Sequence, residues 1–346
     1  MSDFKTFITA PERDRLDVFL AASRRLGAAV QNIEKDFWVC WTLNVVYHGL
    51  APRSPRLLFK GGTSLSKAHN LIQRFSEDID ITVFRGDLNQ AASIEEMEKL
   101  SGKKRRAKLD AIRDACRIWV TGPLRETLAA QIRDFAGDGG RIEIDTDDPD
   151  GQTLLVWYPS LAGEPGYIRP VVRIECGAKS ALDPHRSVSI TPYISGHVAN
   201  LDLSVPDVTA IEPARTFWDK IVIVHGLRRW HEIRGELRYD GQRISRHYYD
   251  LHCLLHSPVR VTIDDRPLGL DCVRHARMFF DRPDFNLEAA QRGSFAVKPN
   301  DRMLDALRRD YRNTAPMIFG QAPSFDEIIT SVSEIDKAVN ATIHEG

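Results

Sequence analysis

The chain has 346 residues, of which 42% are hydrophobic and 27% are charged, and its formal net charge at pH 7 is −1. This composition is typical of a globular protein with one large domain or two ordinary ones. It excludes an overall electrostatic attraction to nucleic acid but leaves a local basic patch open. Five scattered cysteines without a Cys-x-x-Cys pair favour reduced thiols. Without a signal-peptide pattern or an apolar stretch long enough to span a bilayer, we expect a cytoplasmic protein that does not enter membranes.

Two helices are predicted before the first strand. The first is expected over residues 11–27, with Thr9 as its cap. The second carries apolar residues three and four positions apart between residues 33 and 48, which indicates a buried face. The charged residues 34–36 open this second helix. They either reach an active site or form an exposed helix start, with acids near the positive end of the helix dipole.

A glycine turn follows the first predicted strand. Residues 57–59, Leu-Leu-Phe, are apolar enough for a buried strand. Gly61 and Gly62 then allow a tight turn and a close approach of the backbone to a ligand. Thr63 or Ser64 can cap the short helix that comes next, whose N-terminal amides would favour an anion.

The next predicted strand begins with Asp78-Ile-Asp80-Ile. On a strand, Asp78 and Asp80 point to one face and the isoleucines to the other. Two adjacent carboxylates repel each other unless a cation lies between them, and Mg²⁺ often binds one or two carboxylates together with substrate phosphates. A phosphate-binding turn beside such a strand predicts a phosphoryl-transfer site. The alternative is a glycine turn with two surface aspartates.

The middle of the chain is polar and then changes to strands. Residues 94–135 have helical composition and include the basic residues 103–106 and Lys108. This basic run is either a solvated helix face or a patch that contacts nucleic-acid phosphates. Three strands are then predicted, with Glu175 on the polar face of the third, at residues 141–145, 153–158 and 170–176. The acidic segment 147–151 is expected to be a hairpin turn rather than a metal site.

A helix is predicted to open with Glu212-Pro213 and to end near Gly226. Lys220 lies within its apolar stripe. This lysine either buries its stem and places its ammonium group at the rim, or contacts nucleotide phosphates. Residues 227–250 combine arginines with aromatic residues, so they either dock an RNA end or a base, or form internal ion pairs with Glu232, Glu236 and Asp240. The chain beyond residue 267 is mostly helical in composition.

Several of these segments together resemble a known family. The stretch Lys60-Gly-Gly-Thr-Ser-Leu-Ser-Lys67 and the following Arg74-Phe-Ser-Glu-Asp-Ile-Asp80 are similar to the motifs of the nucleotidyltransferase superfamily and, more specifically, of the AbiEii/AbiGii toxin family. Lys220 and the segment Arg246–Leu251 resemble two later motifs of that family. The resemblance covers roughly residues 30–255.

The resemblance implies an α/β fold, in which a nucleotidyltransferase-like mixed sheet is flanked by helices and followed by a mainly helical C-terminal region. It further implies a core over residues 1–204, with a basic helical insertion near 90–135, and a C-terminal domain over residues 205–346 that completes the active site.

The resemblance also implies a function. The protein would be a nucleotidyltransferase toxin of a toxin–antitoxin or phage-defence system. It would transfer a nucleoside monophosphate from an NTP to an acceptor, with Mg²⁺ as cofactor and a cognate antitoxin as partner. In some relatives the acceptor is the 3′ end of tRNA. Small-molecule or protein acceptors, or a non-catalytic nucleotide- or RNA-binding module on the same fold, are the alternatives.

The residues that the resemblance assigns fall into two groups. The catalytic group includes the metal ligands Asp78 and Asp80, with Glu175 or Asp250 to orient or deprotonate the nucleophile; its members are Asp78, Asp80, Glu175, Lys220 and Asp250. The nucleotide-binding group is expected to hold the triphosphate; its members are Lys60, Gly61, Gly62, Ser64, Lys67 and Arg74.

Overall fold

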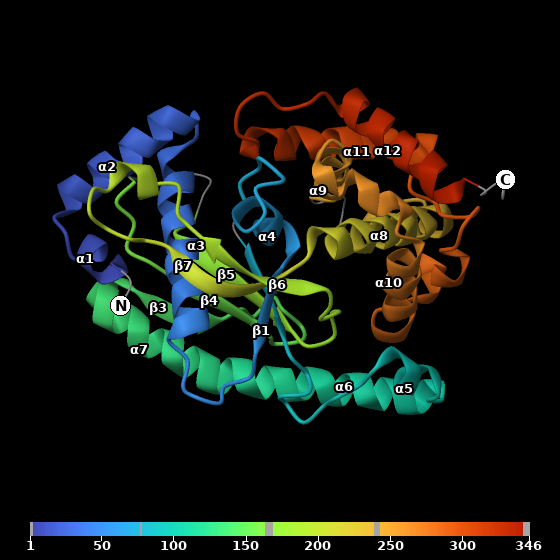
Figure 1. Ribbon diagram of the computed structural model, residues 1–346, viewed down its shortest axis with the longest axis horizontal. Helices are drawn as coiled ribbons and strands as arrows, with labels where there is room; N and C mark the ends of the chain where they lie inside the picture. The colour runs from blue at the N-terminus through green and yellow to red at the C-terminus, as the bar shows by residue number, and fades with distance from the viewer. Residues whose placement is uncertain (1–2, 77, 163–168, 239–242, 342–346) are drawn as a thin grey trace. The chain divides into compact units, whose positions relative to one another are not determined.

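The computed structural model describes residues 3–76, 78–162, 169–238 and 243–341 (Figure 1). Glu77 of the sequence motif and Asp240 of the arginine-rich segment lie outside the described residues. The chain divides into two compact units. The first comprises Met1–His69, Phe75–Ala92 and Gly102–Ile211, and the second comprises Asn70–Arg74, Ser93–Ser101 and Glu212–Gly346.

One mixed sheet forms the framework of the first unit (Figure 1). Its strands lie in the order β3-β4-β5-β2-β1-β7-β6. The central strand β2 runs parallel to β5 and antiparallel to β1, and β1 runs parallel to β7. This mixed sheet confirms the predicted α/β class. The strands are β1 (Leu57–Lys60), β2 (Asp78–Val83), β3 (Arg141–Ile144), β4 (Thr153–Trp157), β5 (Val171–Gly177), β6 (His185–Ile190) and β7 (Val205–Ile211).

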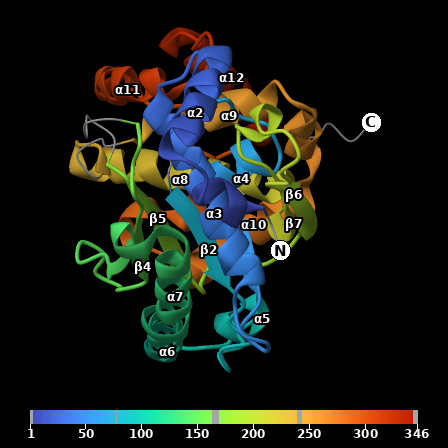
Figure 2. The same ribbon diagram turned by 90° about the vertical axis from the view of Figure 1, so that its left-hand side faces the viewer.

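Helix α3 (Val30–His48) carries much of the core of the first unit. Figure 2 shows it crossing the sheet, where it contacts β2, β5 and β7. Trp38 and Trp41 are buried on it, and burying such side chains stabilises the fold by about 1.5–3 kcal/mol each. The other helices of this unit are α1 (Phe4–Ile8), α2 (Glu12–Leu26), α4 (Gly61–Lys67), α6 (Gly102–Trp119) and α7 (Arg125–Ala136).

The structure contradicts two helix caps predicted from the sequence. Helix α2 begins after Pro11 without a side-chain cap, and Thr9 instead ends α1, where its hydroxyl donates to the Lys5 carbonyl. Helix α4 also starts without a side-chain cap, because Thr63 and Ser64 lie inside the helix. By contrast, the hairpin turn between β3 and β4 is confirmed.

Strands β6 and β7 were not predicted. They pair antiparallel at one edge of the sheet, and β7 also pairs with β1. Because β7 ends at Ile211, the sheet extends beyond the predicted boundary between residues 204 and 205, and the first unit ends with it.

The second unit is mainly helical. Its longer helices are α8 (Pro213–Arg234), α9 (Ser245–Leu255), α10 (Arg266–Phe279), α11 (Asp301–Thr314) and α12 (Phe325–Asn340). The short helix α5 (Ile94–Glu98) also belongs to this unit. The described residues of the chain include no helix that is both long and apolar enough to cross a membrane.

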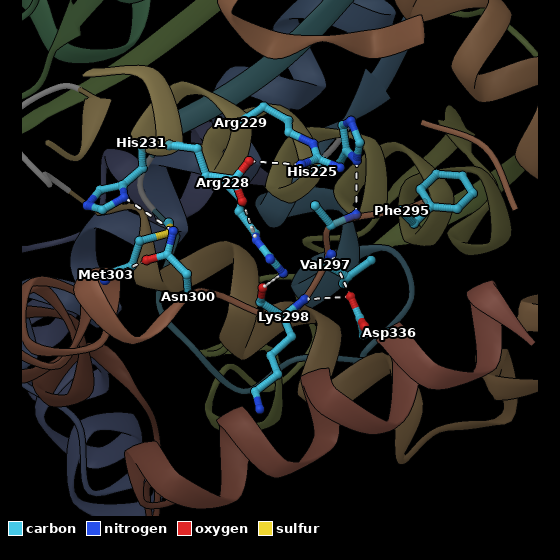
Figure 3. A network of polar contacts seen from close by, with 12 residues as sticks. His225, Arg228, Arg229, His231, Phe295, Val297, Lys298, Asn300, Met303 and Asp336 are labelled. Atoms are coloured by element: carbon cyan, nitrogen blue, oxygen red, sulfur yellow. Dashed lines mark hydrogen bonds and ion pairs between the residues drawn. The ribbon is translucent and has the colours of Figure 1, made fainter. Parts of the chain in front are cut away.

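A network of polar contacts ties α8 to the segment before α11 (Figure 3). His225 Nδ1 accepts a hydrogen bond from the Ala296 amide at 3.0 Å, while His225 Nε2 lies 3.2 Å from the Asn286 carbonyl. The amides of Val297 and Lys298 donate to Asp336 Oδ1 on α12. The His225 contacts require a neutral ring with its proton on Nε2.

His225 is expected to make the stability of this unit depend on pH. Burial lowers its pKa from 6.5 to about 4. The unfolded chain takes up a proton on His225 near the ordinary pKa, and the folded chain does so only near the lowered pKa. The contribution of neutral His225 to the free energy of unfolding is therefore complete above about pH 6.5 and is lost as the pH falls towards about 4. We expect the free energy of unfolding to drop by up to about 3 kcal/mol over this window. Urea titrations at several pH values should show a smaller drop in His225→Gln; an equal drop would exclude His225 as the source.

Candidate active site

Asp78 and Asp80 lie on the central strand of the sheet. Both are partly exposed on one face of β2, whereas Ile79 and Ile81 are buried on the other. The alternation predicted from the sequence is therefore confirmed. The hydroxyl of Thr63 on α4 donates to the Asp78 carbonyl and also contacts Ser76 Oγ, so helix α4 is tied to the start of β2.

The glycine turn lies directly against Asp80. Gly61 has a φ of +76°, which side chains other than glycine rarely adopt, and a Cβ built on it would lie 1.9 Å from Asp80 Oδ2. The backbone at Gly61 therefore lies closer to the Asp80 carboxylate than it could if position 61 held a residue with a Cβ. Lys60, the partner of Asp80 in the β1–β2 register, places its Nζ 3.9 Å from Asp80 Oδ1.

Strand β5 adds charged groups on the other side of β2. In the parallel register Asp80 pairs with Glu175 and Asp78 with Arg173. Arg173 contacts Glu175 at 3.3 Å and Asp145 at 2.7 Å. Burial opposes the charge of Arg173, but Glu175, Asp145 and Asp78 together raise its pKa above the ordinary value. A cation among these carboxylates was not anticipated, although the sequence places Arg173 on the same strand face as Glu175.

The donors at this site fit a magnesium ion. Asp78 and Asp80 offer carboxylate oxygens on one face of β2, and the missing Cβ of Gly61 lets the Asp80 carboxylate lie against the backbone of the turn. Among the described residues, no three His, Cys, Asp or Glu side chains are placed to hold a metal ion by themselves. Two carboxylates completed by substrate phosphates are the arrangement in which Mg²⁺ is usually bound, so the fit is to a metal that arrives with a nucleotide.

In the second unit, Lys220, Asp250 and Arg74 form a buried cluster. Arg74 binds Asp250 through two hydrogen bonds of 2.8 and 2.9 Å, and Lys220 Nζ lies 2.7 Å from Asp250 Oδ2. Burial favours the protonated acid, but Arg74 and Lys220 outweigh it and lower the pKa of Asp250. The ammonium group of Lys220 thus lies in the interior of the unit and not at its rim.

Comparison with known proteins identifies the family. A family model described as nucleotidyl transferase AbiEii toxin, type IV toxin–antitoxin system, matches residues 45–331. The chain belongs to the AbiEii family. Its members are nucleotidyltransferase toxins of type IV toxin–antitoxin systems, so nucleotidyltransferase activity and an antitoxin partner follow from membership.

One solved structure and one negative result complete the comparison. The chain is similar to MenT4, a nucleotidyltransferase toxin from Mycobacterium tuberculosis H37Rv, with 20% identity over 93% of this chain and 97% of that chain and a TM-score of 0.40. A search of curated proteins gave no match.

Two residues expected to bind nucleotide in this AbiEii protein are engaged elsewhere. Lys67 is buried, with its Nζ 2.7 Å from Asp36 Oδ1 and 3.7 Å from the centre of the Tyr193 ring. Burial opposes its charge, but Asp36 raises the pKa of Lys67 above the ordinary value. Ser64 is also buried and donates to the Gly61 carbonyl. These contacts hold α4 in place.

The acids before the glycine turn also have structural partners. Glu34 accepts hydrogen bonds from Ser160 Oγ at 2.6 Å and from the Leu161 amide at 2.7 Å. Asp36 accepts one from the Tyr193 amide at 2.7 Å. Glu34, Lys35 and Asp36 are all buried. The expected exposed helix start is therefore wrong, because these acids bind loops that are remote in the sequence.

The arginine-rich segment forms internal contacts within its described part. Arg228 and Arg229 both pair with Glu232, and they also donate to the carbonyls of Lys298 and Ser294. Arg234 pairs with Asp284. For Arg228 and Arg229 the ion-pair interpretation is confirmed, whereas Arg234 pairs with an acid outside the predicted set.

The basic run on α6 remains open to solvent. Lys103, Lys104 and Arg106 are exposed, whereas the two acids of this helix pair with Arg113 and Arg117 in its second half. The first turn of α6 carries no acidic residue that would interact favourably with the positive end of the helix dipole. The structure is thus compatible with either interpretation of this run.

Proposed function

We propose that this AbiEii protein transfers a nucleoside monophosphate from an NTP to the 3′ end of tRNA, with Mg²⁺ as cofactor, in the cytoplasm. The observation that carries the proposal is the Asp80 carboxylate, which packs against the Gly61 backbone and lies beside Asp78 on the same strand face. The Asp80 carboxylate and the backbone at the start of α4 are therefore in direct contact.

Asp78 and Asp80 would hold the magnesium ion. When bound, it neutralises the charge that develops on the α-phosphate and on the leaving pyrophosphate. The amides of Gly61 and Gly62 and the ammonium group of Lys60 would bind the phosphates. Each of these groups belongs to the first unit.

Glu175 is our candidate for the general base. It neighbours Asp80 in the sheet and its side chain is 41% exposed. A bond forms between the acceptor oxygen and the α-phosphorus while the bond to pyrophosphate breaks, and the acceptor's proton passes to the Glu175 carboxylate. Asp250 is fully buried between two cations, so we assign it the positioning of Lys220 and Arg74 instead of proton transfer.

Label transfer from each α-labelled NTP to total cellular RNA, with magnesium, tests this proposal. We expect label on tRNA with the wild type and none with Asp80→Ala. Asp134→Ala, which removes an exposed carboxylate from α7 in the same unit, should label as well as the wild type. Label on a protein or a small molecule would show that the acceptor is not tRNA. No label anywhere from folded protein would favour a non-catalytic module.

If RNA is the substrate, the basic run on α6 is expected to contribute to binding. Replacing Lys103, Lys104 and Arg106 with glutamine should weaken the binding of total tRNA. It should also reduce the magnitude of the slope of log K against log salt concentration by about two to three. Fluorescence anisotropy at several salt concentrations measures both quantities. The control replaces Arg302, Arg309 and Arg312, which are exposed on α11 and change the charge equally. An unchanged salt dependence in the α6 variant would favour the solvated-face interpretation.

A further inference from the structure

A cavity of about 510 Å³ lies within the second unit, apart from the groups assigned above. Tyr249, His252 and Cys253 of α9 line it, together with His256 directly after the helix. Helix α12 and the segments around Gln73 and Phe319 form the other walls. The size falls in the range of sites for small ligands, which is about 300–1,000 Å³.

A buried serine forms hydrogen bonds with the two histidines of this cavity. Ser331 on α12 places its Oγ 2.8 Å from His252 Nδ1 and 3.1 Å from His256 Nε2. A hydroxyl group has one hydrogen to donate and two lone pairs to accept, so at most one ring accepts from Ser331 and at least one ring donates its own proton to the oxygen. When the serine donates to one ring, the second nitrogens of the two neutral rings differ, one being an N–H donor and the other a bare acceptor.

The rest of the lining adds an aromatic ring and two amides. Phe319 contributes a partly exposed ring, Tyr249 lies buried in the wall, and Gln73 and Gln321 contribute exposed side-chain amides. The Phe319 amide donates to the Gln73 carbonyl at 2.7 Å, which joins two walls. Gln73 and Tyr249 directly precede Arg74 and Asp250, so the buried ion cluster fixes the backbone on both sides.

We infer that this cavity binds a nucleobase. The heteroaromatic rings of nucleobases stack on aromatic side chains and carry adjacent donors and acceptors on one edge, which complements the paired imidazoles and the glutamine amides. The base would belong either to a free nucleotide or to the terminal residue of an RNA. The inference rests on the proposed function for its relevance, but binding itself requires neither magnesium nor transfer.

Cys253 provides a direct probe of the cavity, because its thiol lies in the lining. Burial raises the pKa of this thiol to about 11, so alkylation by iodoacetamide at mildly alkaline pH should be slow and easily followed by mass spectrometry. We expect AMP, GMP, CMP or UMP, or a short single-stranded RNA, to slow the alkylation of Cys253. Protection by the RNA alone would assign the site to an RNA end, and protection by a monophosphate at lower concentration would assign it to free nucleotide.

Two variants test the role of the serine. Ser331→Ala should raise the ligand concentration needed for protection about tenfold, because both imidazole rings lose the hydrogen-bond partner that orients them. Ser333→Ala is the matched control, since its hydroxyl, on the same helix, donates to the Ile329 carbonyl. Gln321→Ala, on an exposed loop, tests the cavity without disturbing the core. Protection should persist in Asp80→Ala, which separates this inference from the proposed function. No protection by any of the probes would overturn it.

Discussion

Replacing Gly61 with alanine is expected to lower nucleotide transfer by about 10²–10³-fold. The added methyl group would lie 1.9 Å from Asp80 Oδ2, and the φ of +76° is unfavourable for alanine in any case. The carboxylate must therefore move, and a displaced electrostatic group in an active site typically costs a factor of this size. Initial rates of label transfer from NTP to RNA measure the effect.

A control must separate the two effects of Gly61→Ala, which are backbone strain at a positive φ and the contact of the new methyl group with Asp80. Gly27 ends α2 with a φ of +62°, and a Cβ built on it meets nothing within 4 Å. Gly27→Ala should therefore lose about 1 kcal/mol of stability without affecting the transfer rate. Near wild-type rates in a folded Gly61→Ala protein would show that the close approach of backbone and carboxylate is dispensable.

The sequence sufficed for features that depend on neighbouring residues. The alternation of aspartates and isoleucines on β2 follows from the two-residue period of a strand. The hairpin between β3 and β4 follows from its acidic, glycine-containing turn. Likewise, Pro213 in the first turn of α8 marks the start of that helix correctly.

Features that depend on distant partners could not be predicted in the same way. Glu34 resembles a solvated acid at a helix start, yet its partner Ser160 is 126 positions away. Lys67 lies in a motif that predicts phosphate contact, and its partners Asp36 and Tyr193 are 31 and 126 positions away in the sequence. The cost of burying a charge is repaid only by such partners, and neither periodicity nor composition reveals where they lie.

The buried cluster of the second unit leads to the largest expected change in stability. Asp250→Ala would leave the buried cations of Arg74 and Lys220 without their shared carboxylate. Removing one partner of a buried ion pair typically costs about 3–5 kcal/mol, and here two cations lose their partner at once. Urea unfolding at neutral pH should show this loss. The control is Glu334→Ala, which breaks an exposed ion pair with Arg260 and should cost about 1 kcal/mol or less.

A combined variant and a pH series test the physical cause. Adding Lys220→Met to Asp250→Ala removes one of the stranded cations, so the double variant should be more stable than Asp250→Ala alone. Because the folded pKa of Asp250 lies below its ordinary value of 3.8, its contribution is complete above that value and is lost as the pH falls through the folded pKa. The difference in the free energy of unfolding between the wild type and Asp250→Ala should therefore be constant near neutral pH and disappear only in strong acid. A double variant less stable than Asp250→Ala would show that Lys220 supports the fold by packing, and not through its charge beside Asp250.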